Sequence, residues 1–328
     1  MKLLFDSVSG LEQELILVGE RCAELCCDPQ GREPLGAIIQ KVLNARGKML
    51  RPALMLTCAR LGGDYDRAGD HLITAACAVE LTHMASLIHD DIVDDAPLRR
   101  GSPSVQSAFG KDMAVYAGDY LLSRVLMALM RPEILPAGEI LAPAISQMCS
   151  GELSQYSAQF DTETTKNRYF ESISGKTAAL FAASCKIGAV MSGCGEKTAA
   201  GLHEFGRCIG VLFQLRDDLM DCVRAGDGGK SLGVDFAAGI YTLPVLCALE
   251  SPLHGPGLRD MARACRENGG SPELSQRLCE AVTAAGGVDC ARRAMEEYRL
   301  AGEKCLEEIG DNPVTRVLKC IAERLCQV

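Results

Sequence analysis

The pattern of apolar and polar residues is helical along almost the whole chain, and good helix formers such as Ala, Leu, Glu, Arg and Met dominate it. Sustained alternation of Val, Ile and Thr is missing, so the pattern predicts no strand. Clusters of Gly and Pro mark where the helices are expected to end. These breaks fall at residues 28–31, 61–64, 97–103, 131–132, 193–195, 225–239 and 255–257. The sequence therefore predicts an all-α fold.

Two of the predicted helices, residues 68–94 and 196–222, are apolar on several sides rather than along one stripe. A helix of this kind is buried on all sides, so both segments are expected at the centre of a bundle. No Pro-, Ser- or Gly-rich linker and no low-complexity tract divides the chain. We therefore expect a single large helical domain over residues 1–328.

The composition is that of a globular protein with a sizeable core, since 48% of the 328 residues are hydrophobic and 23% are charged. The net charge of −9 argues against nucleic acid as a partner, because nucleic-acid-binding surfaces are basic. No uncharged apolar run of about 18 residues is present, so we expect no transmembrane segment. Asp6 follows the first apolar residues directly, which disfavours a secretory signal.

The chain has 17 cysteines, an odd number, scattered without a Cys-x-x-Cys pair. Disulfide frameworks belong to short secreted chains, so we expect reduced thiols and a cytoplasmic location. The densest group is Cys22, Cys26 and Cys27, whose spacing fits small buried thiols on a helix.

The pattern Asp-Asp-x-x-Asp occurs twice, each time at the C-terminal end of one of the two long apolar segments. Residues three and four apart share a helix face, so each motif gathers carboxylates that repel one another. A solvated acidic helix end is the ordinary explanation. It fits poorly here, because apolar residues precede each motif and the pattern is repeated. The carboxylates belong to Asp90, Asp91, Asp94, Asp217, Asp218 and Asp221.

Hard oxygen ligands of this kind suit Mg²⁺, which commonly lies between one or two carboxylates and substrate phosphates. Calcium is less favoured, because nothing in the chain matches an EF-hand loop. A di-iron centre is also less favoured, because no Glu-x-x-His pair accompanies the acids. The two clusters together predict a site for a metal-bound polyphosphate.

Basic side chains that could bind phosphate lie around the two acidic motifs. Arg binds phosphate in a bidentate manner, whereas Lys acts as a point charge. Any one of these residues alone is more often a surface charge, but their positions together favour phosphate binding. They are Lys48, Arg51, Arg99, Arg100, Lys176 and Lys230.

From about Gly47 to Pro244, the chain resembles the trans-isoprenyl diphosphate synthases (polyprenyl synthetases). The two Asp-rich motifs and the basic motifs between them carry the resemblance. The matching segments are residues 47–52, 83–94, 99–101, 117–121, 176–178, 213–221, 229–230 and 242–244. The resemblance implies a transferase with the helical bundle of the isoprenoid synthases, acting as a homodimer on isopentenyl diphosphate and an allylic diphosphate.

The resemblance also implies a role for each motif residue. The main Mg²⁺ ligands would be Asp90, Asp94 and Asp217, with Asp91, Asp218 and Asp221 close by. The diphosphate of isopentenyl diphosphate would be bound by Lys48, Arg51, His83 and Arg100. The allylic diphosphate would be held by Arg99, Lys176 and Lys230. Thr177 and Gln214 would direct their oxygens at the developing carbocation.

The implied mechanism needs no Ser or Cys nucleophile. Metal and cationic side chains neutralise charge on the leaving diphosphate, and the carbocation must be kept from water. A proton is then lost to the departed diphosphate. An acid–base pair of His83 and His89 is an alternative, although a phosphate donor at His83 and packing at His89 explain these residues better.

The chain departs from the family pattern at four positions: Met49, Gln106, Lys111 and Ile240. None of them is a predicted metal ligand. Ile240 stands where many members carry Lys, which removes one candidate phosphate cation.

Product length is expected to depend on the helix before Asp90. Short-chain members tend to carry Phe or Tyr where this chain has the small residues Ala85 and Ser86. An open path favours a long-chain product of the heptaprenyl or octaprenyl class. Leu81, or residues near 116–130, could instead form a floor and give a farnesyl or geranylgeranyl product. Small residues that only let two helices pack closely are the ordinary explanation.

Three other hypotheses about the function remain. A terpene cyclase is disfavoured, because cyclases usually replace the second Asp motif and lack the basic ones. A non-catalytic subunit is disfavoured by two intact acidic motifs, although a catalytic subunit that requires a partner stays open. An acidic helical scaffold without a site leaves the repeated motif unexplained.

Overall fold

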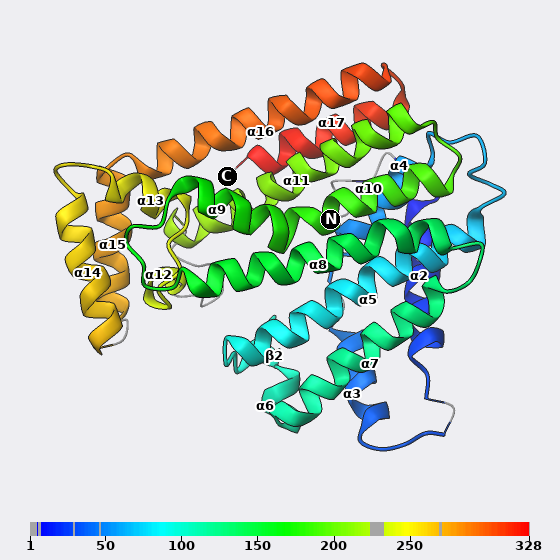
Figure 1. The fold of residues 1–328 in the computed structure, drawn as a ribbon, viewed down its shortest axis with the longest axis horizontal. Coiled ribbons are helices and arrows are strands. Elements are labelled where there is room, and N and C mark those ends of the chain that lie inside the picture. The colour runs from blue at the N-terminus through cyan, green and yellow to red at the C-terminus, as the bar shows by residue number, and fades with distance from the viewer. Residues whose placement is uncertain are drawn as a thin grey trace. The chain divides into compact units, whose positions relative to one another are not determined.

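The computed structural model describes residues 5, 8–28, 30–45, 47–223, 233–268 and 271–327. Within these residues the chain is almost entirely helical, which confirms the predicted all-α fold (Figure 1). The helices before residue 174 are α2 Leu11–Cys26, α3 Leu35–Asn44, α4 Leu50–Ala59, α5 Gly69–Val93, α6 Val105–Phe109, α7 Lys111–Leu129, α8 Leu135–Ser157 and α9 Lys166–Ile173.

A π-helical turn, η1 Ser174–Ala178, separates these helices from the rest. The later helices are α10 Ala179–Met191, α11 Glu196–Val223, α12 Val234–Ala237, α13 Leu243–Leu249, α14 Gly255–Asn268, α15 Pro272–Ala284, α16 Gly287–Ile309 and α17 Pro313–Cys326.

A short hairpin is the one departure from the helical pattern among the described residues. Strand β1, Leu98–Arg99, pairs antiparallel with β2, Ser102–Pro103. The sequence predicts only a break here, because two-residue strands are too short to show alternation. Gly101 supplies the turn with a φ of +77°.

The chain divides into two compact units. The first unit consists of Met1–Ile145, Ala183–His203 and Asp311–Leu318. The second consists of Ser146–Ala182, Glu204–Gly310 and Lys319–Val328. The single domain over residues 1–328 stays a prediction.

The central helix of the first unit is α5, which matches the predicted segment 68–94 within one residue at each end. Its side chains are buried on all sides, and it packs against α2, α4 and above all α7, which lies beside it in Figure 1. It is the one described helix that is long and apolar enough to cross a membrane, and 78% of its most apolar window is buried inside the protein. Such burial is typical of a core helix.

The second long helix, α11, likewise matches the predicted segment 196–222. Its C-terminal part lies in the second unit, where Phe205 and Leu215 are fully buried. In the same unit, α13 packs against α16, and a disulfide joins Cys247 to Cys290 with 6.5 Å between their Cα atoms. The expectation of reduced thiols throughout is therefore wrong for this pair, whose partners lie 43 residues apart in sequence. The other fifteen cysteines are free, and most are buried.

Core packing in the second unit yields a stability prediction. Phe181 is fully buried, and its ring lies 5.5 Å from that of Phe213 between centroids. Because truncation leaves a cavity, we expect Phe181→Ala to lower the free energy of unfolding by about 3–5 kcal/mol. Leu153 is 70% exposed, so Leu153→Ala should change it by less than about 0.5 kcal/mol. Urea unfolding followed by circular dichroism measures both, and equal losses would contradict this packing.

Candidate active site

The first acidic motif occupies the C-terminal end of α5, in the first unit. Asp90 is half-buried, Asp91 is 3% exposed, and Asp94 is the exposed C-cap residue. The last turn of α5 carries no basic residue. Carboxylates at a helix C-terminus oppose the helix dipole, so this end of the helix favours a bound cation.

Asp91 differs from Asp90 and Asp94 because its carboxylate is turned into the protein. Arg99, on β1, donates from Nε to Asp91 Oδ1 at 2.8 Å and from Nη2 at 2.5 Å. Gln106 donates from Nε2 to the backbone oxygens of Asp91 at 2.6 Å and Ala96 at 3.1 Å. The hairpin and α6 are thereby fixed to the end of α5. Asp91 and Arg99, predicted as a metal neighbour and a phosphate ligand, are bound to each other.

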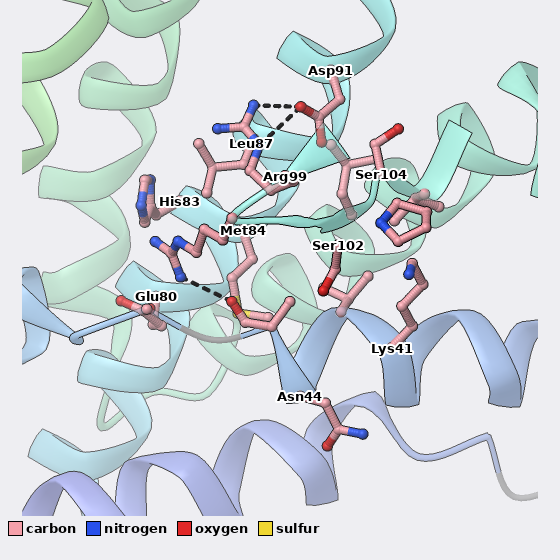
Figure 2. A pocket seen from close by; sticks show the side chains of 17 residues that line it. Lys41, Asn44, Glu80, His83, Met84, Leu87, Asp91, Arg99, Ser102 and Ser104 are labelled. Carbon is pink, nitrogen blue, oxygen red and sulfur yellow. Dashed lines mark hydrogen bonds and ion pairs between the residues drawn. The ribbon is translucent and has the colours of Figure 1, made fainter. Parts of the chain in front are cut away.

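A cavity of about 320 Å³ lies beside this ion pair, entirely within the first unit. Three of the predicted phosphate ligands, His83, Arg99 and Arg100, line it. Figure 2 shows His83 and Arg99 along one wall and Lys41 of α3 on the other side. Lys48 and Arg51 do not line this cavity, so the structure brings together only part of the predicted basic set.

Gly47 is needed for the position of Arg100. The Arg100 guanidinium donates from Nη1 to the Ala45 carbonyl oxygen at 2.9 Å and lies against Gly47. A Cβ at residue 47 would come within 2.4 Å of Arg100 Nη2. The glycine of the basic motif thus allows an arginine from the distant hairpin to lie on its backbone.

Burial controls the charges around the cavity. Burial lowers the pKa of Arg51 to about 10, with Glu80 opposing the shift. Burial, and then Arg51, Arg100 and Arg99, hold the pKa of His83 well below its usual value, so the imidazole is neutral at neutral pH. A neutral imidazole still donates one N–H.

The alternative of an acid–base pair has little geometric support. His83 and His89 are six residues apart on α5, whereas helix neighbours are three or four apart. His89 Nε2 instead lies 3.4 Å from Asp119 Oδ1 on α7.

The second acidic motif lies near the C-terminal end of α11, in the second unit, and repeats the arrangement of the first. Asp217 is exposed and Asp221 half-buried, whereas Asp218 is 3% exposed. Asp218 accepts hydrogen bonds from Tyr169 Oη at 2.5 Å and from Gln214 Nε2 at 2.8 Å. Burial raises the pKa of Asp218 to about 6, against the effect of these two donors. The middle aspartate is again turned inward.

Lys176 and Thr177 lie on η1, a type of turn often found at functional sites. Lys176 Nζ donates to Glu152 Oε2 at 3.0 Å and to Gln155 Oε1 at 2.7 Å. Thr177 Oγ1 donates to Gln214 Oε1 at 2.7 Å. The turn fits closely against α8 at Gly151, where a Cβ would lie 2.2 Å from the Lys176 backbone nitrogen. Lys230 lies outside the described residues.

Two residues near the second motif were missed by sequence reasoning. Tyr169, on α9, is 49 residues from its partner Asp218, and no local pattern links them. Asp235, on α12, is a further carboxylate whose pKa is raised to about 7 by burial and then by Asp218, Asp221 and Asp217. The only sign of Asp235 in the sequence was an acidic residue in the segment between Gly233 and Gly239.

The donor chemistry of the motifs fits a hard cation. In the described part of the chain, no three His, Cys, Asp or Glu side chains converge to form a complete metal site. Mg²⁺ does not need one, because it takes only one or two carboxylates and completes its shell with water and phosphate. The carboxylates at each of these helix C-termini, taken separately, meet this requirement.

Comparison with known proteins gives a consistent result. The family model described as polyprenyl synthetase matches residues 32–271. Component 2 of the heptaprenyl diphosphate synthase of Bacillus subtilis is 39% identical over 282 residues, covering 86% of this chain and 78% of that protein. The octaprenyl diphosphate synthase of Escherichia coli is 32% identical over 274 residues, covering 83% of each.

The fold is similar to that of solved structures. A polyprenyl synthase from Caulobacter crescentus, crystallised with calcium and isoprenyl diphosphate, superposes with a TM-score of 0.89 at 30% identity. The match covers 98% of this chain and 97% of that one.

The contact between Gly47 and Arg100 yields a binding prediction. A methyl group at residue 47 displaces the guanidinium, so we expect Gly47→Ala to weaken binding of inorganic diphosphate about tenfold, the equivalent of one charge-assisted hydrogen bond. Isothermal titration calorimetry measures the affinity. Gly63→Ala is the matched control, because a Cβ at Gly63 meets nothing within 4 Å. Unchanged affinity in Gly47→Ala would contradict diphosphate binding at Arg100.

Proposed function

This chain belongs to the polyprenyl synthetase family, and we propose that it extends an allylic diphosphate with isopentenyl diphosphate to a long-chain polyprenyl diphosphate. Membership makes it a prenyltransferase. The observation that carries the proposal is the pair of intact Asp-Asp-x-x-Asp motifs, each at the C-terminal end of a long core helix. Oxygen ligands at each of these ends suit a diphosphate that arrives with bound metal.

We assign Mg²⁺ to Asp90, Asp94, Asp217 and Asp221 in this proposal. Their positions at helix ends that lack basic residues support the assignment. When bound, Mg²⁺ neutralises the charge that builds on the leaving diphosphate. Asp91 and Asp218 act beside these ligands, because their carboxylates already accept hydrogen bonds from neighbouring side chains.

The basic residues divide between the two substrates as the family resemblance implies. His83 and Arg100, with Lys48 and Arg51, would bind the diphosphate of isopentenyl diphosphate. Arg99, Lys176 and Lys230 would hold the allylic diphosphate. The cavity lined by His83, Arg99 and Arg100 supports diphosphate binding in the first unit, since all three can donate hydrogen bonds to phosphate oxygens.

The reacting carbon loses its diphosphate and becomes an allylic cation. The oxygens of Thr177 and Gln214 would face this cation and stabilise it, and the apolar surroundings would exclude water. The double bond of isopentenyl diphosphate attacks, and the proton that is then lost goes to the released diphosphate.

The long-chain product is supported by the small side chains before Asp90. Ala85 is fully buried on α5, and Ser86 donates its hydroxyl to the His83 backbone oxygen. Neither side chain could close a path for a growing chain as an aromatic ring would. Leu81, fully buried one turn earlier, is the residue that could close it in the short-chain alternative.

Product analysis tests the reaction and the chain length together. With isopentenyl diphosphate, Mg²⁺ and dimethylallyl, geranyl or farnesyl diphosphate, we expect heptaprenyl or longer products by mass spectrometry, and none after chelation of the metal. Ala85→Phe should shorten the product to the farnesyl or geranylgeranyl class, whereas Ala85→Ser should not. If the unaltered chain gives only short products, the long-chain assignment is contradicted and the short-chain alternative holds. If the folded protein elongates none of the primers, the proposal that this chain is an active synthase by itself is contradicted.

We further propose that the chain forms a homodimer through α7 and acts in the cytoplasm. The free thiols of fifteen cysteines support a reducing compartment. The dimer is supported by an apolar stripe along α7 and its C-cap, formed by Tyr116, Leu126 and Met127 on the helix and Met130 at the C-cap. Each of these side chains is more than half exposed, and contiguous apolar patches mark interaction surfaces.

A charge in the α7 stripe tests this interface. We expect Met127→Glu to convert a dimer to a monomer in size-exclusion chromatography with light scattering, because a carboxylate would be buried without a partner. Leu253→Glu is the control, since Leu253 is 81% exposed and lies outside the stripe. A dimer that survives Met127→Glu contradicts the interface. A chain that is monomeric and inactive without additions would favour a second, different subunit.

A further inference from the structure

A chain of hydrogen bonds in the second unit connects the residues assigned to the carbocation with a tyrosine that no motif contains. Thr177 Oγ1 donates to Gln214 Oε1 at 2.7 Å, and Gln214 Nε2 donates to Asp218 Oδ1 at 2.8 Å. Tyr169 Oη donates to the other oxygen, Asp218 Oδ2, at 2.5 Å. All four residues lie in the same unit, so the chain of contacts is internal to it.

The direction of these bonds decides which end of the Gln214 amide faces Thr177. A glutamine amide has a donor end and an acceptor end, and a carboxylate only accepts. Asp218 therefore holds the Nε2 end, and the Oε1 end must turn to Thr177. With the amide reversed, an N–H group would face the position where positive charge develops.

Tyr169 is built to hold Asp218 in this orientation. It is 7% exposed, and its ring packs edge-on against Phe170 with 5.3 Å between centroids. Its hydroxyl also interacts with the backbone amide of Leu243, at the start of α13. Thr165 caps the helix that carries it, accepting from the Arg168 backbone nitrogen at 3.2 Å. Packing of the ring and capping of its helix thus hold Tyr169 in place while its hydroxyl donates to Asp218.

We propose that Tyr169 is a positioning residue for prenyl transfer: through Asp218 it holds the Gln214 carbonyl oxygen toward Thr177, so that oxygen lone pairs face the carbocation. The inference rests on the proposed function. It assigns Asp218 to orienting Gln214 rather than to metal binding. It also gives Asp218 a role different from those of Asp217 and Asp221, which the repeated motif alone does not distinguish.

The proposal predicts a separation of kinetic parameters. Tyr169→Phe keeps the ring and removes only the hydroxyl, so Asp218 loses one of its two side-chain donors. Its carboxylate can then turn away from Gln214 Nε2, which frees the amide of Gln214 to reverse. We expect kcat to fall about 10- to 100-fold, by analogy with the loss of a hydrogen-bonded partner behind a metal ligand. The KM for both diphosphates and the Mg²⁺ concentration for half-maximal rate should change less than about twofold, because no ligand contact is altered.

Tyr298→Phe is the matched control. The Tyr298 ring packs against Phe170, with 5.7 Å between the two ring centroids. Tyr298→Phe therefore removes a hydroxyl from the same aromatic cluster. The hydroxyl of Tyr298 contacts Arg207 and takes no part in the chain through Asp218. We expect kcat of Tyr298→Phe to stay within about twofold of the unaltered chain.

Asp218→Asn tests the orientation of the Gln214 amide directly. It also provides a test if Tyr169→Phe folds poorly. With the asparagine oxygen held by Tyr169, its NH₂ group faces Gln214 and reverses the amide. We expect a loss of kcat at least as large as in Tyr169→Phe. The double variant should be no slower than Asp218→Asn, since both changes act on one chain of contacts. Rates are compared per folded molecule, below the lowest melting temperature.

The outcomes separate the inference from the proposed function. If the unaltered chain elongates no primer, the proposed function fails before any variant is compared. If the unaltered chain is active and Tyr169→Phe has the same kcat, the positioning role is overturned. A raised requirement for Mg²⁺ in Asp218→Asn at unchanged kcat would also overturn it, by assigning Asp218 to the metal.

Discussion

Three carboxylates within two turns, at the end of a core helix where the helix dipole is also negative, repel one another and the backbone. This chain carries that arrangement on α5 and again on α11. Each motif relieves part of the repulsion by turning its middle aspartate inward onto hydrogen-bond donors. The outer aspartates stay at the helix end, where a divalent cation would offset the repulsion, so the same repulsion would favour binding of a metal diphosphate.

The two inward aspartates have different partners and so organise different parts of the protein. Asp91 holds Arg99 and, through its backbone oxygen, Gln106, which fixes the β1–β2 hairpin beside the cavity. Asp218 holds Gln214 and Tyr169, which connects α11 with α9. A buried carboxylate is costly unless it is paired, and in both cases the paired side chains order the neighbouring site.

Close backbone approach serves the same end. Gly47 lets Arg100 lie on the basic motif, and Gly151 lets α8 approach the π-helical turn that carries Lys176 and Thr177. Both glycines stand where any Cβ would collide with a residue of the site. Their effect is geometric rather than chemical, since they place charged and polar groups where substrate oxygens or a cation could meet them.

The sequence by itself determined the all-α fold, the limits of α5 and α11 and the family, because helical periodicity and motif spacing are local properties of the chain. Through the family resemblance it also predicted that Thr177 and Gln214 act together, and the structure shows a hydrogen bond between them. Only the tertiary structure decided that Asp91 and Asp218 face inward, that Tyr169 donates to Asp218, that Lys48 and Arg51 do not line the cavity, and that Cys247 pairs with Cys290. Six aspartates look alike in a repeated motif. Which of them turns inward depends on donors from segments far away in sequence, and no local pattern encodes where those donors lie.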